Sequence, residues 1–189
     1  LGIHDGHNAS AALMKDGKII DAIQEERFNK IKNFGGFPED SISYILKKNN
    51  LELNQIDRFV FGGFLSNAEG QENRKRVLEK YRNNFNRKPS VSQLIKKKII
   101  SILPKYFLNI RKNTKLKYFQ KIRSKKLLSK GVDPEKIDFL EHHLCHASTA
   151  AYGSGNNKDT LVITLDSTGD YSSGSVSTFK KGNLEKILD

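Results

Sequence analysis

The sequence opens with LGIHDGHNASAALMKDGKIIDAIQ, residues 1–24, and this stretch decides the expected fold. Residues 1–4 read as a short strand, and residues 11–15 read as a second strand after a turn rich in Asp, Gly and Asn. The dipeptide at 16–17 is Asp-Gly, a strong signal for a two-residue hairpin. Residues 18–24 then return as a third strand. The sequence therefore predicts a hairpin that packs beside the first strand.

The elements after this hairpin predict the fold class. A helix follows the loop at 34–38, with Ile42, Ile45 and Leu46 as its buried face, and a fourth strand covers 58–61. A strand, a hairpin, a helix and a further strand in this order are typical of an α/β fold, the actin-like ATPase half-domain with ribonuclease H-like topology. In that fold, phosphate contacts lie in the turn between the first two strands.

The net charge of +12 is unevenly distributed along the chain. Residues 71–130 carry 20 Lys and Arg against 2 Asp and Glu, whereas the rest of the chain carries 13 against 19. We therefore expect three parts: residues 1–70, a basic helical insertion at 71–130, and residues 131–189. Within the insertion, residues 90–103 and 115–128 read as helices.

This insertion has several possible roles. Basic amphipathic helices can bind nucleic acid, an anionic membrane or an acidic partner. Lysine clusters without a recognition motif specify no ligand, so we favour solvated helices and do not expect nucleic acid as a partner. We also expect that the insertion can be removed without loss of the sheet.

Composition narrows the class of protein further. Cys145 is the single cysteine, which excludes an internal disulfide. A signal peptide and a long apolar run are both missing from the sequence, so we expect a cytoplasmic chain without a membrane span. The sequence starts without Met and breaks off close to strands at both ends, which suggests a fragment.

The stretch EHHLCHASTAAY at 141–152 holds three of the five histidines. In a helix, His142 and His146 share one face with Cβ atoms roughly 5–6 Å apart, so both imidazoles can bind one metal ion. His143 points about 100° away, or pairs with His146 instead. The alternative is a polar helix face without metal. Cys145 is either a further ligand or a small buried residue.

The next buried stretch, residues 160–165, supports the metal interpretation. It reads as a strand that ends at Asp166, and carboxylates at strand ends line ligand sites in open α/β sheets. Asp166 would complete a set of two histidines and one carboxylate, which suits ferrous iron. Gly169 and Gly174 would let backbone N–H groups approach a phosphate. The alternative is an ordinary Asp/Gly hairpin between two strands.

Three stretches together resemble a known family. They are HDGHNASAALMKDGKIIDAIQEERFNKIKNFGGFPEDSI at 4–42, EHHLCHASTAAYGS at 141–154 and LVITLDSTGDYSSGSVSTF at 161–179. As a set, in this order, they resemble the N-terminal part of the carbamoyltransferase family, which includes nodulation-factor and antibiotic O-carbamoyltransferases. The resemblance covers 1–63 and 136–189, and it leaves the basic segment unexplained.

The resemblance implies a reaction and a set of site residues. Family members use carbamoyl phosphate and ATP to make carbamoyl adenylate, and then transfer the carbamoyl group to a hydroxyl of a small acceptor. It implies that an iron-like divalent ion is bound and that a second, adenylate-forming domain follows. The implied metal ligands are His142, His146 and Asp166. The implied contacts to the adenylate phosphate come from the turn formed by Ser167, Thr168, Gly169 and Asp170.

His7 falls where the family has a histidine near the acceptor hydroxyl. A histidine can take a proton from such a hydroxyl at neutral pH, because its ordinary pKa is near 6.5. Many members follow this histidine with aspartate, whereas this chain has Asn8. The alternative for His7 is a turn residue bonded to its own backbone. In the expected topology, His7 and Asp166 should line one cleft.

Three functions remain open at this point. The first is O-carbamoyl transfer to a small hydroxylated molecule. The second is tRNA threonylcarbamoyl transfer, which shares the fold and metal pair and would use the basic helices. The third is a non-catalytic nucleotide-binding fragment. The residues that resemble the EERF and GGFP motifs favour the first.

Overall fold

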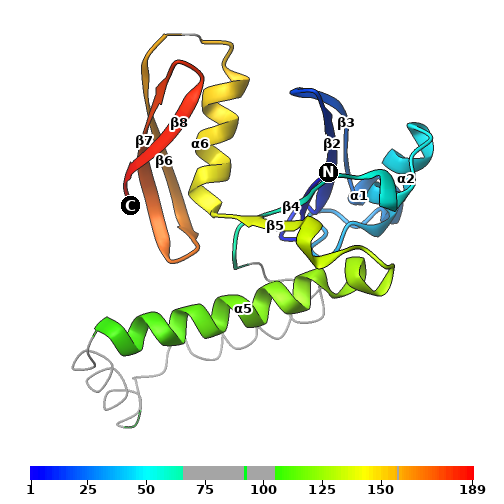
Figure 1. Ribbon diagram of the computed structural model, residues 1–189, viewed down its shortest axis with the longest axis horizontal. Coiled ribbons are helices and arrows are strands. Elements are labelled where there is room, and N and C mark those ends of the chain that lie inside the picture. The colour runs from blue at the N-terminus through cyan, green and yellow to red at the C-terminus, as the bar shows by residue number, and fades with distance from the viewer. Residues whose placement is uncertain (66–91, 93–104, 157) are drawn as a thin grey trace.

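The computed structural model describes residues 1–65, 92, 105–156 and 158–189 (Figure 1). Its larger sheet has five strands in the order β3-β2-β1-β4-β5. β1 pairs antiparallel with β2 and parallel with β4, and β4 pairs parallel with β5. The strands are β1 (Gly2–His4), β2 (Ser10–Lys15), β3 (Lys18–Gln24), β4 (Phe59–Gly62) and β5 (Ile137–Leu140). The predicted strand, hairpin and return are confirmed, and so is the mixed α/β class. The actin-like assignment stays a prediction.

A second sheet contains the three antiparallel strands β6 (Thr160–Gly169), β7 (Ser172–Lys180) and β8 (Asn183–Leu188). Helix α6 (His142–Gly153) follows β5 and lies along one face of this sheet (Figure 1). The expectation that this strand ends at Asp166 is wrong, because β6 continues to Gly169 after an irregularity in its pairing with β7. The turn is made by Asp170 and Tyr171, whose φ values of 51° and 76° fit a two-residue hairpin.

Besides α6, the described residues contain five further helices. They are α1 (Glu26–Asn29), α2 (Glu39–Lys48), α5 (Lys105–Ser129) and the 3₁₀ helices η1 (Leu53–Gln55) and η2 (Pro134–Lys136). The helix predicted at 115–128 lies within α5, whereas the helix predicted at 90–103 lies outside the described residues apart from Ser92. In the described part of the chain, no helix combines the length and apolar character that crossing a membrane requires.

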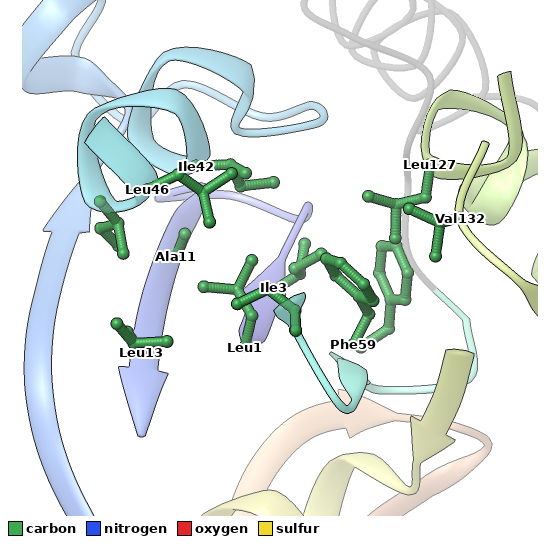
Figure 2. Packing of buried hydrophobic residues seen from close by; sticks show 12 residues of the cluster. Leu1, Ile3, Ala11, Leu13, Ile42, Leu46, Phe59, Leu127 and Val132 are labelled. Carbon is green, nitrogen blue, oxygen red and sulfur yellow. The ribbon is translucent and has the colours of Figure 1, made fainter. Parts of the chain in front are cut away.

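The main core lies between the larger sheet and helices α2 and α5 (Figure 2). Ile42, Ile45 and Leu46 of α2 are buried there, as the helical spacing predicted. Leu127 of α5 belongs to the same cluster and is 1% exposed. The last turns of α5 therefore belong to the core, contrary to the expectation for residues 71–130, whereas the effect of removing this segment on the sheet is untested.

Glu25 explains why the EERF stretch and α2 lie together. Its buried carboxylate accepts hydrogen bonds from Asp40 N at 3.0 Å, Ser41 N at 2.8 Å and Ser41 Oγ at 2.6 Å. These backbone donors belong to the first turn of α2 and have no partner within the helix. Glu25 thus caps α2 from the end of β3, and this contact fixes the helix against the hairpin.

Candidate metal centre

At the start of helix α6, carboxylates accept hydrogen bonds from backbone N–H groups that have no partner within the helix. Glu141 precedes the helix and accepts from His143 N at 3.0 Å and Leu144 N at 2.8 Å. Asp170, from the β6–β7 turn, accepts from His142 N at 2.8 Å. Negative charge at this end of a helix is favourable, because the unpaired N–H groups carry partial positive charge. The first turn of α6, which carries His142, is therefore held at a defined place against the second sheet.

The structure brings His142, His146 and Asp166 together, as the sequence predicted. Their ligand atoms all lie within 4.8 Å of one another, and in the described residues they form the one such group. His142 Nε2 lies 3.0 Å from His146 Nε2 and 2.9 Å from Asp166 Oδ2, and His146 Nε2 lies 3.6 Å from Asp166 Oδ2. Ligands about 2.1 Å from one ion lie about 3.0 Å apart at right angles and about 3.4 Å apart in a tetrahedron. The three atoms therefore fit one face of a metal's coordination shell.

Asp166 carries a negative charge at this site. Its hydrogen bond with His142, the backbone N–H of Ser167 and the two imidazoles nearby lower the pKa of its carboxyl to about 2. Ser167 N donates to Asp166 Oδ1 at 2.6 Å, which leaves Oδ2 facing the histidines. A charged oxygen between two imidazole nitrogens is a donor set that suits a divalent transition metal.

Gly169 makes room for the ring of His142. A Cβ at Gly169 would lie 2.0 Å from Cδ2 and 2.3 Å from Cγ of His142, far inside any real contact. The imidazole thus lies directly on the backbone of β6. The resemblance places Gly169 in a phosphate-binding turn. In the structure, the missing side chain of Gly169 lets His142, a candidate metal ligand, lie against β6.

His143 anchors α6 to the sheet and was missed from the sequence. It is fully buried, its Nε2 donates to Ser172 O at 3.2 Å, and its Nδ1 shares a hydrogen bond of 2.9 Å with Thr164 Oγ1. It does not pair with His146 as a ligand. The signal was available in the helical spacing, because His143, Ala147 and Ala151 lie four residues apart and form the buried face of α6.

Cys145 is better described as a small packed residue than as a ligand. Burial raises the pKa of its thiol, which disfavours the thiolate form that binds metals. Its Sγ lies 3.8 Å from the position of a Cβ on Gly62. Cys145 is half-buried, so the structure lies closer to the interpretation as a small buried residue than to the interpretation as a ligand.

Asp170 acts as a clamp between three segments. Besides His142 N, its carboxylate accepts from Phe64 N at 2.7 Å and Leu65 N at 2.6 Å, both in the loop after β4. The carboxylate is therefore engaged by backbone donors. The phosphate contact predicted for Ser167, Thr168, Gly169 and Asp170 stays a prediction.

His7 lies on the turn between β1 and β2, in contact with the loop before α2. It is exposed, pairs with Gly35 in an isolated β-bridge, and its carbonyl accepts from His4 Nε2 at 2.9 Å. Burial lowers the pKa of His4. Within the described residues, the structure gives no contact between His7 and the candidate ligands, so the single cleft stays a prediction.

Asn8 sets the proton position on His7. Asn8 Nδ2 lies 3.3 Å from His7 Nδ1, and an amide N–H donating there leaves the ring proton on Nε2. An aspartate at this position would accept from Nδ1–H and leave Nε2 free to take a proton. In this chain, a base at Nε2 requires the Asn8 amide to turn over and present Oδ1.

Comparisons with known proteins identify the family of this chain. A family model described as Carbamoyltransferase N-terminus matches residues 1–188. Nodulation protein NolNO of Sinorhizobium fredii is 28% identical over 168 residues, which are 89% of this chain and 20% of NolNO. The uncharacterized protein MJ1051 of Methanocaldococcus jannaschii is 31% identical over 187 residues, 99% of this chain and 26% of that protein. The chain thus spans a fifth to a quarter of these relatives. Because the family model matches nearly every residue, the chain belongs to the carbamoyltransferase family and corresponds to its N-terminal part.

Proposed function

We propose that this chain takes part in transferring a carbamoyl group from carbamoyl phosphate, through carbamoyl adenylate made with ATP, to a hydroxyl of a small acceptor. The observation that carries the proposal is the convergence of His142, His146 and Asp166 on one point, in a member of this family. These three residues would hold a divalent ion. Two imidazoles and one carboxylate favour Fe²⁺ over the harder Mg²⁺.

The ion, when bound, would polarise the carbamoyl oxygen and balance the phosphate charge. The acceptor oxygen forms a bond to the carbamoyl carbon, the bond to the adenylate phosphate oxygen breaks, and AMP leaves. Once the Asn8 amide has turned over and Oδ1 accepts from Nδ1–H, His7 takes the proton of the acceptor hydroxyl at Nε2. The charged Asp166 orients His142 by its hydrogen bond of 2.9 Å and lies 3.6 Å from His146 Nε2.

Metal content in the complete protein tests the site. We expect the wild type to bind one Fe²⁺ or Co²⁺ per chain, and the double variant His142→Ala/His146→Ala to lose it. The matched control is His7→Ala, which removes a histidine outside the cluster and should keep the metal. Equal metal content in the double variant and the wild type would refute the ligand assignment.

Transfer from supplied carbamoyl adenylate to an acceptor tests the reaction. His7→Ala should slow transfer by about 10²–10⁴-fold, the usual contribution of a positioned acid or base. Formation of the adenylate should persist, because the family resemblance assigns that step to another domain. If His7→Ala transfers at the wild-type rate with saturating acceptor, His7 is only a turn residue.

A further inference from the structure

Arg123 is an arginine buried among apolar groups, on a helix that otherwise reads as basic and solvated. Its side chain and that of Asp5 are 0% and 1% exposed, and Arg123 Nη2 lies 2.7 Å from Asp5 Oδ1. Its Nε donates to the same carboxylate, at 2.9 Å from Oδ2. The guanidinium also lies against the stacked rings of Phe61 and Phe139. Burial of a charge is costly unless it is paired, and this one is paired on several sides.

The remaining donors of Arg123 reach the loop that follows β4. Nη2 donates to Gly62 O at 3.1 Å, and Nη1 donates to Gly63 O. Gly63 has φ of +78°, a conformation that side chains rarely adopt, so the loop bends at this residue. Arg123 therefore holds two successive carbonyls at the bend, and it ties them to Asp5 on the first strand's turn.

The next two residues of the same loop lead to the candidate metal centre. Phe64 N and Leu65 N donate to Asp170, whose carboxylate also accepts from His142 N. A hypothetical Cβ on Gly63 would lie 3.9 Å from both Asp170 Oδ2 and His142 Nδ1. Arg123 thus connects Asp5 to the 62–65 loop by hydrogen bonds. The backbone of this loop is in turn hydrogen-bonded to Asp170, which also accepts from His142 N.

We infer that Arg123 is a positioning residue for the metal centre, acting through the 62–65 loop and Asp170 on the first turn of α6. This inference rests on the proposed metal site. It gives α5, the end of the basic segment, a function beyond covering the core. The competing explanation is that the Arg123–Asp5 pair only stabilises the fold.

Three variants separate these explanations in the complete protein. Arg123→Lys keeps the charge beside Asp5, but a single ammonium cannot replace a fork that also binds two carbonyls. Asp170→Asn removes part of the clamp at its other end. Leu127→Ala is the matched control, because it removes a buried side chain of the main core one turn further along α5. Co²⁺ affinity is measured by optical titration for each variant.

We expect Arg123→Lys and Asp170→Asn each to weaken Co²⁺ binding by about 10–100-fold, the effect of losing support behind a ligand. Leu127→Ala should bind Co²⁺ within about 3-fold of the wild type, although it destabilises the fold. Equal affinities for Arg123→Lys and Leu127→Ala would overturn the inference and leave the proposed site intact. A wild-type protein that binds no Co²⁺ would overturn both.

Amide hydrogen exchange of the metal-free protein gives a readout that does not depend on metal. In Arg123→Lys, the amides of Phe64, Leu65 and His142 should exchange faster than in Leu127→Ala, compared at matched global stability. Unchanged protection of these three amides would show that Arg123 does not act through the loop, and it would also overturn the inference.

Discussion

The substitution Gly169→Ala tests the geometry of the candidate metal centre most directly. The new Cβ would lie 2.0 Å from His142 Cδ2, whereas carbon atoms in contact are about 3.5–4.0 Å apart. The ring must therefore withdraw by about 1.5 Å. Alternatively, β6 must move and carry Asp166 with it. Both responses separate His142 Nε2 from Asp166 Oδ2, which now lie 2.9 Å apart.

The expected loss of Co²⁺ affinity follows from the small range of ligand distances that metal sites tolerate. Ligand distances in real sites hold to within about 0.2 Å, so a shift of this size removes a ligand. We expect Co²⁺ affinity to fall by at least about 100-fold. This is the upper end of the loss caused by mutating residues that only support a ligand. Overpacking should also cost about 1–3 kcal/mol of unfolding free energy.

Optical titration with Co²⁺ and denaturant unfolding measure the two effects. The control is Gly153→Ala, at the end of α6, where an added Cβ meets nothing within 4 Å. It should keep the metal affinity and stabilise the helix by up to about 1 kcal/mol. Wild-type affinity in Gly169→Ala would refute the reasoning, because His142 would then not depend on the space at Gly169.

Three further predictions concern the scaffold. Glu25→Gln should lower the unfolding free energy by about 2–3 kcal/mol, since three donors lose a buried charged acceptor, whereas Glu26→Gln should change it by less than about 0.5 kcal/mol. Hydrogen bonds from Lys126 and Lys130 lower the pKa of Glu39 below 4.5. Glu39→Gln should therefore cost less than about 1 kcal/mol at neutral pH. Urea unfolding at several pH values should show that the difference in unfolding free energy between Glu39→Gln and the wild type disappears as the pH falls below 4.5 through the folded-state pKa of Glu39. Joining residue 70 to residue 131 should abolish cooperative unfolding by circular dichroism, because an unpaired buried Asp5 costs about 3–5 kcal/mol and loss of Leu127 about 2–5 kcal/mol; a sheet that still melts cooperatively would contradict this.

Local patterns in the sequence predicted the elements that depend on interactions between residues close together in the chain. Alternation and the Asp-Gly turn located the strands of the first hairpin, and the spacing of four placed His142 and His146 on one helix face. Asp166 was found because it follows a run of β-branched and apolar residues. In each case the information lies within about ten residues of the feature.

The features that the sequence did not reveal depend on distant partners. After Leu165, the run of Asp, Ser and Thr reads as a turn, yet Gly169 pairs with Ser172 and extends β6. Arg123 stands among lysines and reads as solvated, and its burial depends on Asp5, 118 positions away in the sequence. No local pattern records a contact of that separation.

This separation between Asp5 and Arg123 has a consequence for how the protein reaches its native state. The turns of α5 and the first hairpin can form within microseconds, but their meeting must wait for closure of a long loop. The entropy of closure rises only slowly with loop length, by about 0.6 kcal/mol for each doubling. Insertions between β4 and α5 would therefore slow docking only modestly. The length of this connection can thus change at little cost to loop closure, provided that the Arg123–Asp5 pair is kept.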